Sequence, residues 1–163
     1  MIKLETCRLI IRDYVAADLE DFHRLISDKE NMSLVDGVFS NSVEETRENL
    51  ENAMRNEDGH YFVICDKESC AFIGSVGYTY TEGPAPDEKT AHLGYFILPE
   101  YHGKGFTTEA VKKVLEFAFD SDGCAGITTG CHISHIASAR VMEKAGFRKV
   151  SETEDRLEYV IEA

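Results

Sequence analysis

The sequence predicts an α/β protein, and three observations support this prediction. Segments in which apolar and polar residues alternate, as in strands, are interleaved with segments whose apolar residues recur every three or four positions, as in helices. The chain has 163 residues, enough for one sizeable core, so residues 1–163 are expected to form a single domain. No apolar run approaches the roughly 20 residues of a membrane span and no signal-peptide segment opens the chain, so we expect a soluble cytoplasmic protein without membrane contact.

The N-terminal half contains strand-like and helical patterns in turn. Leu19, Phe22, Leu25 and Ile26 form one helical stripe, and Ser42 precedes a capping-box pattern at the start of a polar segment. The expected elements are a strand at 6–12, a helix opened by Asp18, a loop at 31–41 with a turn at Asp36-Gly37, and a surface helix from Ser42 to about Asn56.

From residue 60 onwards the pattern is richer in strands. A hairpin turn is predicted at 66–69, and a loop with two prolines at 83–87. Gly146 follows a helical stripe and is placed to end that helix. The expected elements are strands at 60–65, 71–80, 90–98, 126–133, 147–151 and 157–161, and helices at 106–119 and 136–145.

The composition restricts the classes of partner. The formal net charge is −13, which disfavours nucleic acid because binding to phosphate backbones needs cationic side chains. The same charge is compatible with a cationic substrate, and equally with solubility alone. The five cysteines form no C-x-x-C pair and are expected to be reduced. His132 and His135 have a plausible ligand spacing, but no converging carboxylates accompany them, so no metal is expected.

The stretch from Pro99 to Ala110 has the features of a phosphate-binding loop. A strand-like run stops at the proline, crosses two glycines, and becomes an amphipathic helix. The first N–H groups of a helix lack internal partners and carry partial positive charge, and glycines let a phosphate approach the backbone. The residues expected to hold the phosphate are Gly103, Lys104, Gly105, Phe106, Thr107 and Thr108.

Three other interpretations of this loop can be compared with its residues. A P-loop requires serine or threonine after the lysine, but Lys104 is followed by Gly105. A dinucleotide fingerprint requires a third glycine, where this chain has Thr108. A glycine-bearing turn without any ligand remains an alternative.

The loop resembles the acyl-CoA loop of the GNAT N-acetyltransferases, written [QR]-x-x-G-x-[GA], with Glu100 at its first position. The form P-E-Y-x-G-K-G-x-x-T-E-A is most similar to the branch that contains the ribosomal-protein N-terminal (alanine/serine) acetyltransferases. The opening T-x-R-L-x-[IL]-R and the order of elements also resemble that family. The resemblance implies a mixed, mostly antiparallel twisted sheet with splayed central parallel strands, flanked by helices on both faces.

The resemblance also implies acetyl-CoA as the cofactor. Its diphosphate would lie on the loop, and its pantetheine arm between the strand that ends at Leu98 and the strand that ends near His132. Backbone groups of Phe96, Ile97 and Leu98 would bond the arm, and one N–H would polarise the thioester carbonyl.

A second motif begins at His135 and resembles the family pattern N-x-x-[SA]-x-x-[VL]-x-E-K-x-G-F. Helical spacing places His135, Ser138 and Met142 on one face. Histidine replaces the usual asparagine at a cofactor-contacting position, and Met142 replaces the tyrosine that protonates the thiolate in many members. The resemblance therefore assigns Ser138 both cofactor contact and stabilisation of the leaving sulfur.

The expected reaction is direct transfer of acetyl to a primary amine, either a protein N-terminus or a small molecule. His92 is the candidate general base because imidazole titrates near neutrality. Its orientation depends on the pleat of its strand, which the sequence leaves open; Glu82, Glu88, Tyr78 and Tyr80 are weaker candidates. The alternatives are an inactive CoA-binding sensor or structural module, and a nucleotide-binding domain. A homodimer is compatible with the resemblance.

Overall fold

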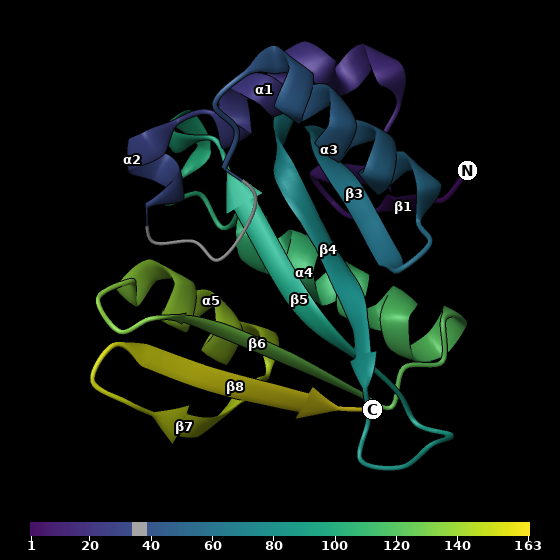
Figure 1. Cartoon of the computed structure of the whole chain (residues 1–163), viewed down its shortest axis with the longest axis vertical. Helices are drawn as coiled ribbons and strands as arrows, with labels where there is room; N and C mark the ends of the chain where they lie inside the picture. Colours follow the sequence, from purple (N-terminus) through teal and green to yellow (C-terminus); the bar gives the residue numbers. More distant parts are fainter. Residues whose placement is uncertain (34–38) are drawn as a thin grey trace.

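The computed structural model describes residues 1–33 and 39–163, which include one eight-stranded sheet. The predicted turn at Asp36-Gly37 lies outside these residues. The strands follow the order β1-β2-β3-β4-β5-β6-β8-β7 across the sheet (Figure 1). Neighbours pair antiparallel except β5 and β6, so the predicted mixed and mostly antiparallel sheet is confirmed. The strands are β1 Lys3–Glu5, β2 Leu9–Asp13, β3 Gly59–Asp66, β4 Phe72–Glu82, β5 Lys89–Ile97, β6 Gly126–His132, β7 Arg148–Glu152 and β8 Arg156–Glu162.

The chain opens with a hairpin, which corrects the prediction of one strand at 6–12. The backbone turns at Thr6, whose N–H donates to the Leu9 carbonyl at 3.0 Å and whose hydroxyl accepts from the Leu9 N–H at 2.9 Å. β1 has only three residues, which is too short for an alternating pattern to be recognised.

One face of the sheet carries the helices of the N-terminal half. They are α1 Leu19–Ile26, α2 Lys29–Met32 and α3 Val43–Arg55. The Ser42 hydroxyl accepts from the Glu45 N–H at 3.2 Å, which confirms the predicted cap of α3. α2 was not predicted, and it extends into the expected loop at 31–41. Its cap is Asp28, whose carboxylate accepts from the Asn31 N–H at 3.1 Å.

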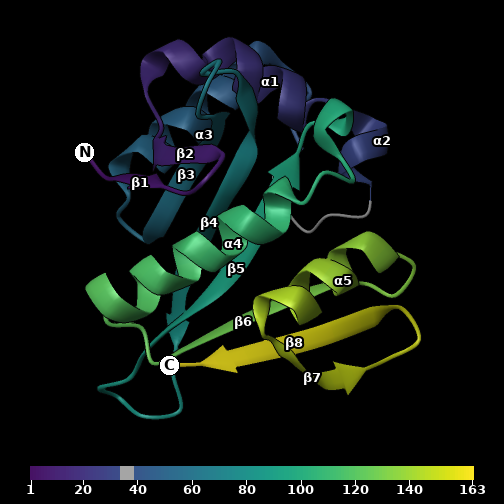
Figure 2. The same ribbon diagram turned by 180° about the vertical axis from the view of Figure 1, so that it is seen from behind.

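The opposite face carries α4 (Phe106–Glu116) and α5 (Ile136–Ala145), which lie in front of the sheet in Figure 2. α4 continues as a π-helical turn over Phe117–Ser121, so the helical segment ends near the predicted position. α5 has the predicted bounds, and Gly146 ends it with φ 103°. The helices on both faces confirm the expected layers.

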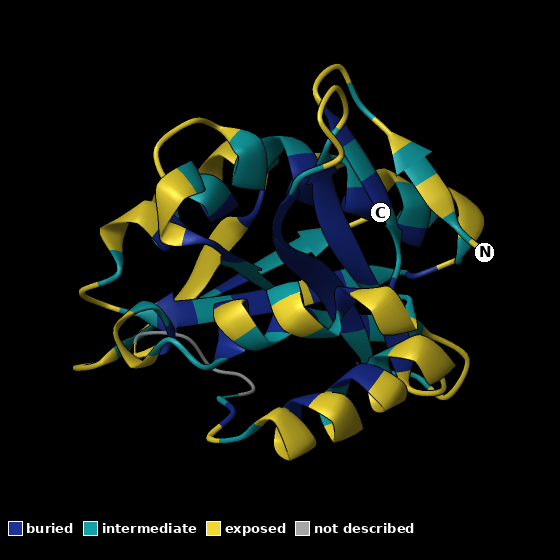
Figure 3. Ribbon diagram, turned by 90° about the horizontal axis from the view of Figure 1, so that it is seen from above, coloured by how far each residue is buried: buried dark blue, intermediate teal, exposed yellow. Residues whose placement is uncertain are grey.

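The sheet separates two apolar cores, and its central strands are dark blue in Figure 3 because helices cover both of their faces. The side chains of Leu93 and Ile97 belong to the core under α4 and α5. Leu98 belongs to the core under α1 and α3, and Phe96 packs against it. Successive β5 side chains therefore enter opposite cores, as the pleat of a strand requires.

The parallel pair β5 and β6 separates after its first few residues. Pairing begins at Thr90 with Gly126 and ends at His92 with Thr128, whereas β5 continues to Ile97 and β6 to His132. Figure 1 shows the two strands together at one end and diverging towards α2 and α5. The predicted splay is therefore present. Among the described residues, no helix is long and apolar enough to span a membrane.

Candidate active site

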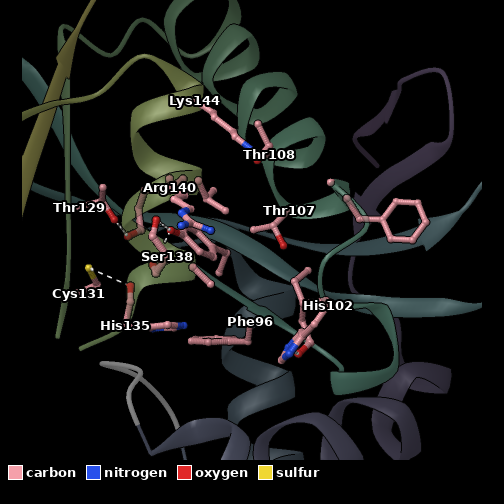
Figure 4. Close-up of a pocket in the computed structure, with 18 of the residues that line it drawn as sticks. Phe96, His102, Thr107, Thr108, Thr129, Cys131, His135, Ser138, Arg140 and Lys144 are labelled. Carbon is pink, nitrogen blue, oxygen red and sulfur yellow. Dashed lines mark hydrogen bonds between the residues drawn. The ribbon is translucent and has the colours of Figure 1, made fainter. Parts of the chain in front are cut away.

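A cavity of about 390 Å³ occupies the splay between β5 and β6. Its walls come from β5, the loop before α4, the first turn of α4, β6 and α5 (Figure 4). Most of the predicted site residues lie in this lining: His92, Phe96, Ile97, Gly103, Gly105, Phe106, Thr107, Thr108, His135 and Ser138. Segments 92–97, 103–108 and 135–138 are thus brought to one place.

The loop before α4 presents helix N–H groups to this cavity. Gly103 and Gly105 have φ of 73° and 79°, a conformation that glycine adopts with little steric cost. Gly105 caps α4 without a side chain, and the Glu109 N–H bonds back to the Gly105 carbonyl at 3.2 Å. The N–H groups of Phe106, Thr107 and Thr108 precede this first helical bond, so they are placed to bind an anion.

Two predicted cofactor-binding residues lie outside the cavity lining. Leu98 is buried in the core under α1 and α3, and its N–H donates to the Ile73 carbonyl at 3.0 Å. Lys104 directs its ammonium group over the Tyr101 ring, 5.8 Å from the ring centroid. For Lys104 the position differs from the prediction because a run of sequence does not indicate on which side of a loop a side chain emerges. For Leu98, whose backbone was expected to bond the arm, it differs because the N–H is already bonded to β4.

The direction of the β5 backbone groups also refines the prediction. The Leu98 N–H is directed to β4, whereas the Leu93 carbonyl accepts from the Thr129 hydroxyl of β6 at 3.0 Å. Since successive residues of a strand direct their backbone groups to alternate sides, Leu93, Tyr95 and Ile97 face the splay. Of the three predicted backbone partners, Ile97 alone faces it, and its carbonyl accepts from Asn31 Nδ2 at 3.0 Å and from His102 Nε2 at 2.9 Å.

Two cations in the lining were missed by the sequence interpretation. Arg140 and Lys144 lie four residues apart on α5, and Figure 4 shows the end of Lys144 directed towards Thr108 of α4. Their spacing is a signal that sequence reasoning could have used, because residues four apart share a helix face. They supply positive charge to the cavity of a protein whose net charge is −13.

Ser138 makes a hydroxyl pair with a residue that the sequence did not single out. Its Oγ lies 2.7 Å from the Tyr95 hydroxyl, and the Tyr95 hydroxyl also donates to the Ser138 carbonyl at 3.2 Å. Ser138 is 5% exposed, and both residues line the cavity. Burial raises the pKa of Tyr95, although the bond with Ser138 acts in the opposite direction, so Tyr95 remains a neutral donor. Met142 lies in the apolar core instead of the cavity.

His92 lies where this cavity meets a second one. The second cavity, of about 340 Å³, lies towards α1 and α3, and it shares His92, Gly94 and Phe96 with the first. The His92 ring nitrogen Nδ1 lies 3.0 Å from the Thr128 hydroxyl. The sequence left open which face of the sheet the His92 side chain is on. It is on the same side of β5 as Phe96, which packs against the core under α1 and α3.

Two histidines and a cysteine, His132, His135 and Cys131, lie near the end of β6. Among the residues that the structure describes, no three histidine, cysteine, aspartate or glutamate side chains gather as a metal site requires. The Cys131 thiol lies 4.0 Å from the His135 carbonyl, and the His135 N–H donates to the His132 carbonyl at 2.9 Å.

The sequence model of the family described as Acetyltransferase (GNAT) domain matches residues 8–148. The chain belongs to the GNAT acetyltransferase family. A relative, the uncharacterized N-acetyltransferase YnaD of Bacillus subtilis (strain 168), is 30% identical over 148 residues, which cover 90% of this chain and 82% of YnaD.

Solved structures share the fold of this GNAT acetyltransferase. RimL, a ribosomal L7/L12 α-N-protein acetyltransferase solved with CoA in a disulfide with one of its cysteines, superposes with a TM-score of 0.84 at 17% identity, covering 99% of this chain and 98% of RimL. The spermidine N-acetyltransferase of Vibrio cholerae, solved with CoA and spermine, has a TM-score of 0.82 at 20% identity, covering 96% of each chain.

By its family the protein is an acetyltransferase, and the cavity has features that would suit a CoA molecule. A loop with two left-handed glycines accommodates a diphosphate, and Arg140 and Lys144 offer further charge to phosphate groups. The stretch of β5 that has separated from β6 offers backbone groups to the amides of an extended arm.

Proposed function

We propose that the protein, acting as one catalytic domain over residues 1–163, transfers acetyl from acetyl-CoA to the α-amine of a peptide or small molecule. The observation that carries this proposal is that the two cavities meet at His92, Gly94 and Phe96. A cofactor entering from the α5 side and an acceptor entering from the α3 side would meet at this edge of β5.

Acetyl-CoA supplies an acetyl group activated as a thioester. The N–H groups of Phe106, Thr107 and Thr108 bind its diphosphate in this proposal, together with Arg140 and Lys144. The backbone of Tyr95 and Ile97 faces the splay and would hold the arm, and a β5 N–H would polarise the carbonyl.

The chemical step is a direct transfer in which His92 takes the proton from the attacking amine. A C–N bond forms, the C–S bond breaks, and the sulfur leaves with its electron pair. Ser138 donates its hydroxyl hydrogen towards this sulfur. The Tyr95 hydroxyl, 2.7 Å from Ser138 Oγ, would then turn its one hydrogen from the Ser138 carbonyl to this oxygen. The products are the N-acetylated amine and free CoA, which regains a proton, so atoms and charge balance.

The second cavity favours an acceptor with one amine and an apolar neighbour. Tyr14, Phe22, Tyr61 and Phe96 give it an aromatic lining. Asp58 is the one carboxylate among its described lining residues, and it accepts from the Tyr61 hydroxyl at 3.1 Å. A polyamine with several charges would need more carboxylates, whereas an α-amine titrates near 8 and loses its proton readily.

The test compares amines by thiol release from acetyl-CoA. Peptides with free N-termini are expected to react faster than spermidine. His92→Gln should lower kcat about 100-fold at pH 7, in the range of general-base catalysis, while the Kd for CoA is unchanged. The difference in kcat between wild type and His92→Gln should shrink as pH rises past 8, because the amine then loses its proton without a general base. His132→Gln is the matched control, since His132 bonds Ser134 outside the cavity lining. An unchanged kcat in His92→Gln removes His92 from the mechanism.

A catalytically inactive CoA-binding module is the second candidate function. It is favoured by Met142, which fills the core at the position where many family members carry a catalytic tyrosine. This candidate predicts calorimetric binding of CoA with no thiol release for any amine, and turnover of any amine excludes it.

A further inference from the structure

Arg8 reaches from the turn between β1 and β2 to the first turn of α4. Its Nε and Nη2 atoms both lie 2.8 Å from Glu109 Oε2, and its backbone N–H donates to Glu109 Oε1 at 3.0 Å. The Thr6 hydroxyl donates to the same Oε1. The carboxylate of Glu109 is therefore held on both oxygens by the N-terminal hairpin, about 100 residues away in the chain.

The same guanidinium group also contacts the phosphate-binding loop. Arg8 Nη1 donates to the Lys104 carbonyl at 3.0 Å, and the guanidinium carbon lies 4.5 Å from the centroid of the Phe106 ring. A Cβ on Gly105 would meet Arg8 Nη2 at 3.4 Å. One side chain thus touches Lys104, Phe106 and Glu109 and lies against Gly105.

These contacts restrain a segment that contains two left-handed glycines. Gly103 and Gly105 are both left-handed, and glycine loses more conformational freedom on ordering than any other residue. An N–H cluster binds an anion best when it is ordered beforehand, since a mobile loop must lose entropy on binding. Arg8 supplies that order from outside the loop, since it does not itself line the cavity.

Arg8 also controls a negative charge beside the anion site. Glu109 lies in the first turn of α4, where the helix dipole attracts any anion, so a free carboxylate would compete with a phosphate. Burial alone would raise the pKa of Glu109, but the bonds from Thr6 and Arg8 lower it below the ordinary value. The carboxylate stays ionised, and its charge is directed towards Arg8.

We propose that Arg8 and Glu109 are positioning residues that hold the loop from Lys104 to Phe106 in the conformation that binds the diphosphate of CoA. Exposed ion pairs contribute little to folding, and these side chains are 44% and 21% exposed. The effect of the pair is therefore expected on cofactor affinity more than on stability. The proposal rests on CoA as the cofactor and does not depend on the identity of the acceptor.

The experiment compares two acetyl donors. S-acetylpantetheine has the reacting thioester but lacks the diphosphate, so it does not use the loop. For Arg8→Gln and Glu109→Gln, the KM for acetyl-CoA and the calorimetric Kd for CoA should rise about tenfold, the weight of one or two hydrogen bonds. The kcat/KM for S-acetylpantetheine should stay unchanged. The double variant should lose little more affinity for CoA than either single variant, because the two residues act together.

A matched control and a second variant keep the test decisive. Arg148→Gln removes an exposed ion pair with Glu162, at 2.9 Å on the far edge of the sheet. This variant should change neither the KM for acetyl-CoA nor the kcat/KM for S-acetylpantetheine. If Arg8→Gln does not fold, Arg8→Lys keeps the charge but cannot hold Glu109 and Lys104 together, and should weaken CoA binding several-fold. Equal losses with both donors, or an unchanged Kd for CoA, overturn the proposal. If the wild type acetylates no amine, the Kd for CoA still tests the pair, so the two failures are distinguishable.

Discussion

At the scale of single residues, Tyr95 and Ser138 bring a pair of hydroxyl groups to the cavity wall, whereas Met142 lies in the apolar core. The two oxygens lie 2.7 Å apart. If Tyr95 donates to Ser138, the serine hydrogen is free to turn towards the cavity, and each bond in such a chain strengthens the next. Because burial raises the pKa of Tyr95, the tyrosine keeps the hydrogen that this arrangement needs.

The pair leads to a prediction about turnover. Ser138→Ala should lower kcat about tenfold or more, in the lower range of acid catalysis, with little change in the KM for acetyl-CoA. Tyr95→Phe should lower kcat several-fold. The double variant should have a kcat only slightly below that of Ser138→Ala. Steady-state thiol release measures both. Tyr159→Phe is the control, since that hydroxyl donates to Glu143 at 3.3 Å away from the cavity. Full additivity of the two losses would mean that the hydroxyls act separately.

The place of Ser138 in the cavity wall could be predicted from the sequence, and that of Tyr95 could not. The serine lies within a motif with recognisable spacing on one helix. The tyrosine contacts it across 43 positions, and that contact exists only because β5 directs Tyr95 to the α5 side of the sheet. His92 shows the same limit, since its residue type was informative but its side of the strand required the structure.

At the scale of elements, the loop between β5 and α4 depends on its glycines for conformation and for access. Gly103 has φ 73° and lines the cavity, and no protein atom lies within 4 Å of the position that its Cβ would occupy. Gly123, after α4, has φ 74° and equally free surroundings, but it does not line the cavity. The two positions therefore differ only in their relation to the site.

Comparing these two glycines separates the effect of backbone strain on stability from the effect of an added methyl group on CoA binding. Alanine at either position should cost about 1 kcal/mol of unfolding free energy, because an L-residue is disfavoured in the left-handed conformation. Gly103→Ala should in addition raise the Kd for CoA, since its methyl group enters the space beside the phosphate. Gly123→Ala should leave that Kd unchanged. Urea denaturation and calorimetry provide the two measurements, and equal Kd values for the two variants would contradict a phosphate site at this loop.

Elements with strong local signals were predicted closely, and weak ones were missed. α5 has the expected bounds because Gly146 ends it in the left-handed conformation. β1 and α2 have three and four residues, and such short elements depend on tertiary contacts for their stability. β1, for example, is held by the partner strand β2.

At the scale of the whole molecule, the sheet is held firmly at the end opposite the open splay. Asp122 follows the π-helical turn and accepts from Lys89 Nζ at 2.6 Å, from the Tyr78 hydroxyl at 2.8 Å and from the Tyr80 hydroxyl at 2.9 Å. Lys89 opens β5 one residue before the pairing with β6 begins. The polar network thus joins β4, β5 and the end of α4 where the parallel strands are still paired. The cavity lies at the other end, between the diverging parts of β5 and β6.

The network predicts a pH dependence of stability. Burial would raise the pKa of Asp122, but the bonds from Lys89, Tyr78 and Tyr80 outweigh it and lower the pKa below its usual value. A carboxylate with a lowered folded-state pKa stabilises the protein above its unfolded value, near 3.9, and loses this contribution as pH falls through the folded value. Asp122→Asn should therefore cost about 1–3 kcal/mol at pH 7, the penalty for weakening bonds at a mostly buried group.

The difference between wild type and variant should stay constant from pH 7 to about pH 5 and shrink only below the unfolded value near 3.9. Urea denaturation across this range measures it, and Asp120→Asn, at an exposed position two residues earlier, is the control. The KM for acetyl-CoA should not change, because the network lies at the closed end of the splay. A rise in that KM would mean that the closed end sets the width of the open one, and the division of the sheet into a holding end and a binding end would then be wrong.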